Sequence, residues 1–453
     1  MTSASAQEPG SVNDSSLRTI IVDKIIIVGN EQTDESIIAR ELLFHEGDTL
    51  QTKDLSRLIA ASKENILKTL LFHDAIIVND GISEHITFLV RVSERWYWWI
   101  WPLIENPDRN FNDWWQHHDL SRLSAGLHYQ HENARGRSEK LHIKGLAGYR
   151  TYVEASYEWP YINSSKTIGA GFYTSYSSQK EINFATENNR QVFYHGQHVM
   201  LKSFLIGGSI RYRPGNYVTN SLTVQFSSLT FNDTLQSLNP DYLKSTIDNP
   251  KLVSLSYLIK ADYRDNRTYP LKGYYLESEL GYLVNLNNNF NVQSWRTSIR
   301  GHVKAANRLY AAAELALKLT FPEVKPYYLQ NALGFDRNFV RGYEYMVIEG
   351  AHYWLAKTQL RYAVLPGIEI HVPFVKSERF NTIPLSIYAG PHLDAGRVFP
   401  SINPDINPLE GKVLCGYGFG IDFVTYYDKV LRCEYTFRCD GLSGFFLHFM
   451  AMI

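Results

Sequence analysis

From about residue 95 onward, apolar and polar residues alternate along successive segments of the chain. In the segment 255–264, Leu255 and Tyr257 fall on one face, whereas Lys260 and Asp262 fall on the other. A period of two is the signature of β-strands whose two faces meet different surroundings. Helical periodicity is absent from this part of the chain. The sequence therefore predicts that the larger, C-terminal part is all-β.

The composition narrows the kind of β-structure. Hydrophobic residues make up 44% of the chain, yet no stretch approaches the roughly 18 apolar residues that a spanning helix needs. In a soluble sandwich the charged strand faces would meet water, whereas in a membrane barrel they line the lumen and the apolar faces meet lipid. Inner-face charges of both signs, and aromatic residues near strand ends such as Tyr269 that are typical of interfacial girdles, favour the barrel. The net charge of −1 gives no reason to expect a nucleic-acid partner.

The alternating segments can be counted. Sixteen candidate strands lie at 95–103, 121–131, 138–149, 150–160, 166–178, 195–213, 217–231, 252–265, 273–285, 291–305, 308–321, 352–366, 382–399, 412–426, 428–438 and 443–453. The fold class predicted is thus a 16-stranded transmembrane β-barrel over residues 95–453. One long connector, 322–350, interrupts the series. Connectors of that length in a compact fold are usually functional.

The N-terminal part has a different pattern. Residues 1–19 are rich in small and polar residues and predict a disordered tail. This tail lacks a basic and an apolar region, so we expect that a signal peptide has been removed or is absent from the sequence. Residues 20–93 predict the order β-α-α-β-β, an α+β domain, with turns at Gly29-Asn30 and Glu46-Gly47-Asp48. This order resembles a POTRA domain, the periplasmic polypeptide-binding module of outer-membrane assembly factors.

Motifs along the barrel resemble the bacterial surface antigen superfamily of BamA, TamA and two-partner secretion transporters. The long connector holds Val340-Arg341-Gly342-Tyr343, similar to the family's VRGF/Y loop signature. The other matching motifs, in family order, are Asn133 to Arg137, Asp262 to Asn266 followed by Tyr269 to Gly273, His392 to Gly396, and Gly416 to Ile421. The resemblance covers nearly everything after residue 20. It implies a single-POTRA member with loop 322–350 folded into the lumen.

The resemblance also implies a partner for the loop arginine. The family's arginine pairs with an inward carboxylate of the wall, and Arg can form a bidentate fork where Lys cannot. Residue parity places Asp394 on the inner face, so we expect it to pair with Arg341. Where relatives often carry an acid on the twelfth strand, this chain has Gln359, at most a neutral hydrogen-bond acceptor. The alternative interpretation is a plug that only stabilises the barrel.

The first and last predicted strands would meet at a seam. The first carries Trp96 and Trp98 in a run that is apolar on both faces, and the last carries Phe446 and Phe449. The tryptophan run is either a membrane-interface anchor or a gate strand. The three cysteines are too few for a disulfide framework. Cys415 and Cys433 fall on neighbouring predicted strands and could meet.

These patterns and the resemblance imply a function without covalent chemistry. We expect an outer-membrane assembly, insertion or translocation factor that is not an enzyme and has no catalytic residue, metal or cofactor. The POTRA edge would accept clients by β-augmentation, and the seam would open laterally. Expected partners are unfolded β-strand polypeptides of outer-membrane clients, outer-membrane lipid and accessory envelope subunits. A dedicated secretion pore for one partner protein and a passive or structural barrel remain the alternatives.

Overall fold

The structure is a computed structural model that describes residues 19–81, 84–105, 123–244, 249–288, 290–336, 338–371, 382–400, 402–425 and 429–449. Of the predicted N-terminal tail, 1–18 lies outside the described residues, as does the end of the predicted last strand, 450–453. The chain divides into two compact units between Arg95 and Trp96. Among the described residues, no helix has both the length and the hydropathy for a membrane span.

The first unit is a four-stranded sheet with two helices. Its elements are β1 (Thr19–Val28), α1 (Glu35–Ala39), β2 (Thr49–Gln51), α2 (Thr52–Lys68), β3 (Phe72–Asn79) and β4 (His85–Glu94). The sheet order is β2-β1-β4-β3, with β1 and β4 parallel and the other neighbours antiparallel. The predicted β-α-α-β-β order is confirmed, with β2 as an additional strand. At three residues, β2 is too short for its alternation to be recognised in the sequence.

The core of this unit follows from the sequence pattern. The Asp34 side chain accepts a hydrogen bond from the Ser36 N–H at 2.9 Å and so caps α1. Alternate residues of β4, among them Phe88 and Val90, are fully buried, and the Phe88 ring lies 4.4 Å from that of Phe44. Burial on one face of a sheet against helices is what makes a domain of this size stable.

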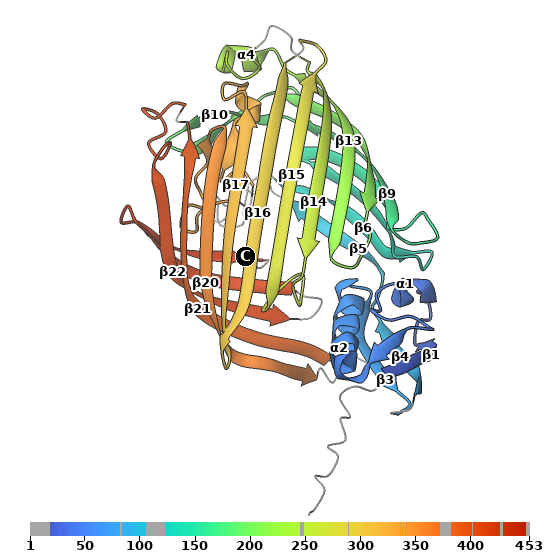
Figure 1. Ribbon diagram of the computed structural model, residues 1–453. Coiled ribbons are helices and arrows are strands. Elements are labelled where there is room, and N and C mark those ends of the chain that lie inside the picture. Colours follow the sequence, from blue (N-terminus) through green and yellow to red (C-terminus); the bar gives the residue numbers. More distant parts are fainter. Residues whose placement is uncertain are drawn as a thin grey trace, which may run out of the picture. The chain divides into compact units, whose positions relative to one another are not determined.

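The second unit contains one 16-stranded antiparallel sheet, which confirms the predicted strand number. Its strands are β5 (Trp98–Glu105), β6 (Ser124–Ala134), β7 (Glu139–Gly148), β8 (Arg150–Trp159), β9 (Ile168–Gln179), β12 (Leu201–Tyr212), β13 (Val218–Phe231), β14 (Lys251–Asp262), β15 (Gly273–Asn285), β16 (Asn291–Ala306), β17 (Leu309–Phe321), β20 (His352–His371), β21 (Thr382–Phe399), β22 (Val413–Thr425), β23 (Lys429–Arg438) and β24 (Ser443–His448). Neighbours in the sheet follow chain order throughout. Figure 1 shows β13 to β17 side by side.

Burial in this sheet is inverted relative to a soluble protein. In β20, Lys357 and Arg361 are buried, whereas Leu360 and Tyr362 on the other face are exposed. The same inversion holds in β23, where Arg432 and Glu434 are buried, whereas Tyr435 and Phe437 on the other face are exposed. Charged residues inside and apolar residues outside are the pattern of a membrane barrel. The fold class predicted from the alternation is therefore confirmed.

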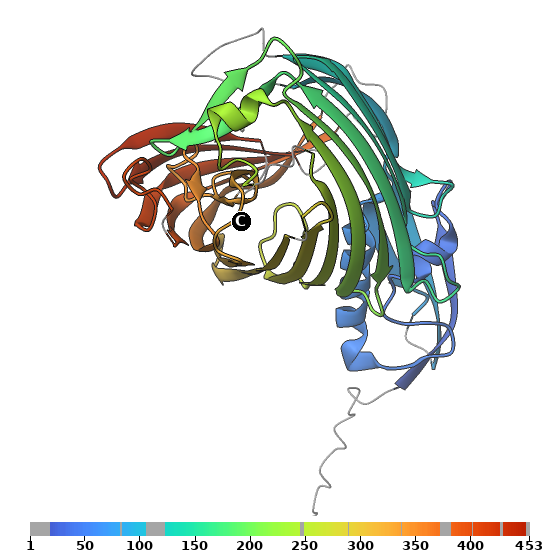
Figure 2. The ribbon, with the colours of Figure 1, turned by 90° about the horizontal axis from the view of Figure 1, so that it is seen from above.

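The connectors add structure that the alternation did not predict. A separate hairpin, β10 (Glu181–Glu187) with β11 (Arg190–His195), precedes β12, and helix α4 (Thr234–Leu238) follows β13. The long connector between β17 and β20 holds the 3₁₀ helix η3 (Tyr327–Leu329) and the small sheet of β18 (Asn331–Leu333) with β19 (Ile348–Glu349). We call residues 322–350 the plug loop. Figure 2 shows the sheet curving around this segment.

The sheet has two ends. β5 forms a ladder with β6, and β24 forms a ladder with β23. Within the residues that the structure describes, no ladder joins β5 to β24. We call the region between these two terminal strands the seam.

The inverted burial predicts how a charge is tolerated on each face. Ile206 lies exposed in the middle of β12, and Ser209 lies on the opposite, half-buried face. We expect Ile206→Arg to destabilise the folded barrel by about 2–4 kcal/mol if it lies near the bilayer midplane, because lipid cannot solvate the guanidinium. Ser209→Arg should change stability by less than half of that. Urea unfolding in liposomes measures both, and equal losses would contradict the assignment of faces.

Candidate functional site

The plug loop is held against the inner wall by an apolar cluster. Val340 and Tyr343 of the loop are buried with Leu355 of β20, Val398 of β21 and Leu414 of β22. This apolar cluster fixes the loop in one position, because each of these side chains would lose its packing if the loop left. The cluster thereby sets the position of Arg341, which lies between Val340 and Tyr343 in the chain.

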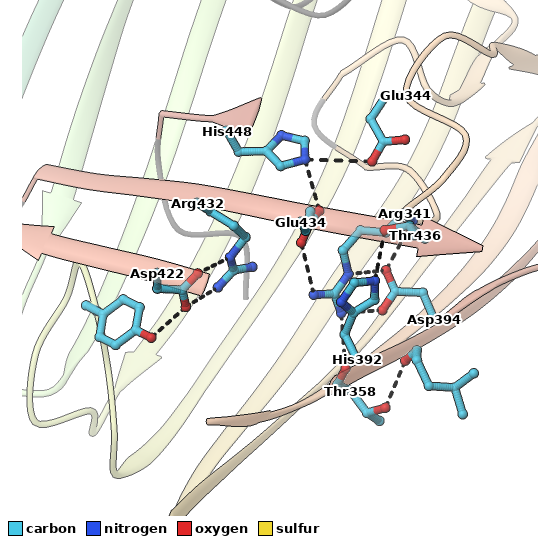
Figure 3. Close-up of polar contacts among 12 residues, drawn as sticks. Arg341, Glu344, Thr358, His392, Asp394, Asp422, Arg432, Glu434, Thr436 and His448 are labelled. Atoms are coloured by element: carbon cyan, nitrogen blue, oxygen red, sulfur yellow. Dashed lines mark hydrogen bonds and ion pairs between the residues drawn. The ribbon is translucent and has the colours of Figure 1, made fainter. Parts of the chain in front are cut away.

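Arg341 forms the central polar contact between the loop and the wall (Figure 3). Its Nε donates to Asp394 Oδ2 at 2.8 Å, and its Nη2 donates to Asp394 Oδ1 and to the Thr358 carbonyl at 3.0 Å. Both side chains of the ion pair are fully buried. The bidentate fork requires the planar guanidinium, which Lys lacks. Gln359 is also buried, but its carbonyl oxygen makes no hydrogen bond within the described residues, so the Thr358 carbonyl takes the place expected for Gln359.

Two glycines allow the loop to approach the wall this closely. Gly342 has φ +93°, a conformation that side chains rarely adopt, and a Cβ there would lie 2.9 Å from Arg438 Cγ. Gly416, in β22, faces the loop backbone, and a Cβ there would lie 1.9 Å from the Arg341 carbonyl oxygen. Any larger residue at position 416 would push Arg341 away from Asp394. The Tyr343 ring adds a further contact, since the Arg438 guanidinium lies 4.1 Å from its centroid.

A second polar contact joins the plug loop to the last strand. His448 Nε2 of β24 lies 3.0 Å from Glu434 Oε1 of β23 and 3.7 Å from Glu344 Oε1 of the loop. All three side chains are buried, and Glu434 also lies 3.9 Å from Arg341 Nη1. Burial raises the pKa of the Glu344 carboxyl. The ligand atoms of Glu344, Glu434 and His448 lie within 4.8 Å of one another. Two carboxylates and one imidazole at this spacing could hold a divalent cation.

A third polar contact joins Asp422 of β22 to Arg432 of β23. Asp422 accepts hydrogen bonds from Arg432 Nη2 at 2.8 Å and from Tyr269 Oη at 2.6 Å. The Tyr269 side chain is buried, and Arg361 lies 4.6 Å above its ring. The sequence interpretation of Tyr269 as a girdle residue is therefore wrong. The turn before β15 carries the ring into the lumen, where its hydroxyl finds a carboxylate that alternation could not reveal.

The predicted seam residues divide into two environments. Trp98 opens β5 and is exposed, and Trp96 lies just before the strand with its ring 5.0 Å from that of Trp98. Phe446 is buried on the inner side of β24, with its ring 5.7 Å from Tyr345 of the plug loop. Phe449 follows β24 and is exposed. Phe446 thus belongs to the contact between β24 and the loop.

The cysteine pairing differs from the one considered from the sequence. Cys415 forms a disulfide with Cys439, with a Cα–Cα distance of 5.4 Å, and Cys433 is a free thiol. The register explains the difference. Cys433 pairs with Ile421 in the ladder of β22 with β23, whereas Cys415 lies at the other end of β22 beside the turn that holds Cys439.

The plug loop is also tied to the other connectors through Asn189, in the turn of the β10–β11 hairpin. The Val347 N–H donates to the Asn189 carbonyl at 2.8 Å, and Asn189 Oδ1 accepts from the Leu409 N–H at 2.9 Å. Tyr327 Oη lies 2.9 Å from Thr186 Oγ1 of β10. These residues come from three separate connectors. Sequence reasoning missed them because polar side chains in turns carry no periodicity.

Together, an inverted 16-stranded sheet, a plug loop fixed to its wall and an N-terminal α+β domain define a membrane β-barrel protein with one POTRA domain. Comparison with known families agrees: residues 133–425 match the Omp85 superfamily domain, and 20–94 match the POTRA model described as a surface antigen variable number repeat. The chain belongs to the Omp85 superfamily, whose barrels reside in the outer membrane with POTRA domains in the periplasm.

Solved structures show the same fold at low sequence identity. The chain is similar to BamA from Haemophilus ducreyi lacking POTRA domains 1–3, with 15% identity, a TM-score of 0.52 and coverage of 95% of this chain and 83% of that one. It is also similar to CdiB from Escherichia coli, with 12% identity, a TM-score of 0.56 and coverage of 95% and 74%. No curated protein matches the sequence.

The buried fork predicts that charge alone cannot replace Arg341. We expect Arg341→Ala to lower the free energy of unfolding by about 3–5 kcal/mol, because Asp394 would stay buried without a partner. Arg341→Lys should recover less than half of this loss, since an ammonium cannot make both carboxylate contacts and reach the Thr358 carbonyl. Urea unfolding followed by heat-modifiable gel mobility measures these losses. A Lys variant as stable as the unaltered protein would show that the fork is dispensable.

The second contact predicts coupling between the plug loop and the last strand. His448→Gln should destabilise the barrel by about 3–5 kcal/mol, because two buried carboxylates lose the group between them. Combining it with Glu344→Gln should restore part of the stability, since one of the two charges is gone. His195→Gln, in an exposed residue of β11, is the control. Losses that simply add in the double variant would argue against coupling.

Proposed function

We propose that this protein assembles, inserts or translocates other proteins at the outer membrane, with the POTRA domain in the periplasm and the barrel seam as the site where client strands add. The observation that carries the proposal is the seam itself, two terminal strands that no ladder joins within the described residues. In lipid, every backbone N–H and C=O needs a partner. A strand edge without a neighbour at membrane depth is therefore a place where another strand is stabilised.

The POTRA domain offers a second edge. β3 has eight residues and pairs only with β4 in the described part of the domain. The Asp80 N–H donates to the Thr87 carbonyl at 3.2 Å, and this bond determines which residues of β3 form hydrogen bonds with β4. The backbone groups of Ala75 and Ile77 then face away from β4. An extended client would add there by β-augmentation, with backbone hydrogen bonds that do not depend on the client's sequence.

The plug loop supports assembly rather than passive conduction. Its apolar cluster and the Arg341–Asp394 pair occupy the inner side of the wall formed by β20, β21 and β22. A channel for small solutes would be obstructed by such a segment. Outer-membrane lipid and accessory envelope subunits are the further expected partners. Family members are assembly or transport factors without enzymatic activity, and nothing in the proposed strand addition requires covalent chemistry.

Locking the seam tests the proposal. In a Cys433→Ser background, Ile100→Cys in β5 and Phe445→Cys in β24 would be linked by a disulfide or a short bifunctional reagent. We expect the linked protein in liposomes to fold an outer-membrane barrel client at least tenfold more slowly. A client strand can no longer form backbone hydrogen bonds with the locked edge, and about one such bond already corresponds to a tenfold factor. Reduction should restore the rate of the disulfide-linked form.

The matched control is a staple between strands that already pair. Ile206→Cys and Phe226→Cys face each other in the ladder of β12 with β13, so their disulfide should leave the rate unchanged. Full activity of the locked seam would exclude seam opening. Depletion in cells separates the remaining alternatives: loss of one protein from the cell exterior would indicate a dedicated secretion pore, and unchanged levels of every client would indicate a structural barrel.

A further inference from the structure

The residues of β5 that face the seam can be assigned one by one. β5 pairs with β6 from Trp98 opposite His131 to Glu105 opposite Ser124. The Glu132 N–H donates to the Tyr97 carbonyl at 2.8 Å. In an antiparallel ladder, the backbone groups of successive residues point alternately toward one neighbour and the other. The odd-numbered residues of β5 therefore bond to β6, and the even-numbered residues direct their N–H and C=O groups toward the seam.

The other side of β6 gives the same phase. The Tyr149 N–H donates to the Leu123 carbonyl at 3.2 Å, so the odd-numbered residues of β6 bond to β7 and the even-numbered ones to β5. Even-numbered residues of β6 stand opposite odd-numbered residues of β5. Two independent hydrogen bonds thus agree that positions 98, 100, 102 and 104 form the seam edge of β5.

One of these four positions is a proline. Pro102 has no N–H, and its ring occupies the space where the N–H would point. Proline is accepted in a sheet only where its missing donor faces away from a neighbouring strand. The ladder with β6 is continuous past this residue, since Trp101 pairs with His128 and Leu103 with Gly126. The hydrogen-bond donor that Pro102 lacks is therefore missing only from the edge of β5 that faces the seam.

We propose that Pro102 ends the ladder that any strand can form on the seam edge of β5. An extended strand docked there is hydrogen-bonded along Trp98 to Trp101 and separates from β5 between Pro102 and Glu105. For a client strand this rests on the proposed function. For β24 it does not, because the same edge chemistry applies to any extended polypeptide. The residue thereby limits the length of strand that the seam can capture.

The energetic reason lies in the surroundings of the edge. The side chains of Ile100 and Ile104 are exposed on the apolar outer face, 57% and 74% respectively. A partner carbonyl opposite Pro102 would find no donor there, and at membrane depth no water replaces it. One unpaired buried carbonyl disfavours the paired state by roughly tenfold. Contact with the proline ring adds to this, so the docked strand separates at this point. Proline is one of the devices by which natural sheets prevent extended pairing at an edge.

A cysteine scan measures the length of the ladder. The probe is an unfolded outer-membrane barrel protein with one cysteine at each position of its last strand in turn, added to the full chain in liposomes. In a Cys433→Ser background, Ile100→Cys should give about tenfold more disulfide with this probe than Ile104→Cys does. Adding Pro102→Val should bring the two yields within about twofold of each other, since it restores the missing donor. Equal yields before that change would overturn the proposal while leaving strand addition at the seam intact.

Proline substitutions in β5 test, without any client, which residues direct their N–H groups toward the seam. The N–H of residue 104 faces the seam, whereas that of residue 103 bonds to β6, so Ile104→Pro should keep the heat-modifiable fold and Leu103→Pro should lose it. The fraction of folded protein should differ by at least about tenfold between the two variants. Equal damage from both would show that even-numbered positions do not face a free edge, and the proposal would fall. If the probe forms no disulfide at any position but this test holds, the proposed function fails and the edge assignment stands.

Discussion

The structure depends on the requirement that backbone hydrogen-bonding groups be paired wherever water is absent. A sheet of sixteen strands meets this requirement at every internal ladder, from β5 with β6 to β23 with β24. The two terminal strands meet it on one side only within the described residues. The pairing requirement that makes the barrel stable is thus incompletely met at the seam. The functional proposal follows from these backbone groups of the two terminal strands, which another strand could pair.

The same requirement explains the interior. Alternation turns Lys357, Asp394 and Glu434 inward, where each needs a partner of opposite charge or a hydrogen-bond donor. The plug loop supplies part of this: Arg341 contacts Asp394 and lies 3.9 Å from Glu434. The wall also forms pairs of its own, such as Arg432 with Asp422. A lumen filled in this way is rigid, because moving one charged group leaves another without its partner.

The sequence predicted what repeats and missed what does not. Most of the sixteen strands could be located because period two persists over them, and Asp394 could be placed inward because parity survives along β21. The first strand was an exception, since it lies in a run that is apolar on both faces. The hairpin of β10 with β11, the short strand β2 and the disulfide of Cys415 with Cys439 could not be predicted, since each depends on how connectors meet in space. Gln359 shows the limit of carrying over a family pattern: position and burial agree with a partner of Arg341, but the backbone carbonyl of Thr358 makes the contact.

The two strands of the seam are held by different means. β24 is fixed from within, because His448 and Phe446 contact Glu344 and Tyr345 of the plug loop. β5 is held by its ladder with β6, and Pro102 leaves its other edge without one backbone hydrogen-bond donor. A strand with five of its eight residues to the N-terminal side of Leu103 can still present Trp98 and Ile100 to a partner. Movement of the plug loop would therefore act first on β24, and the length of any pairing at the seam would be set by β5.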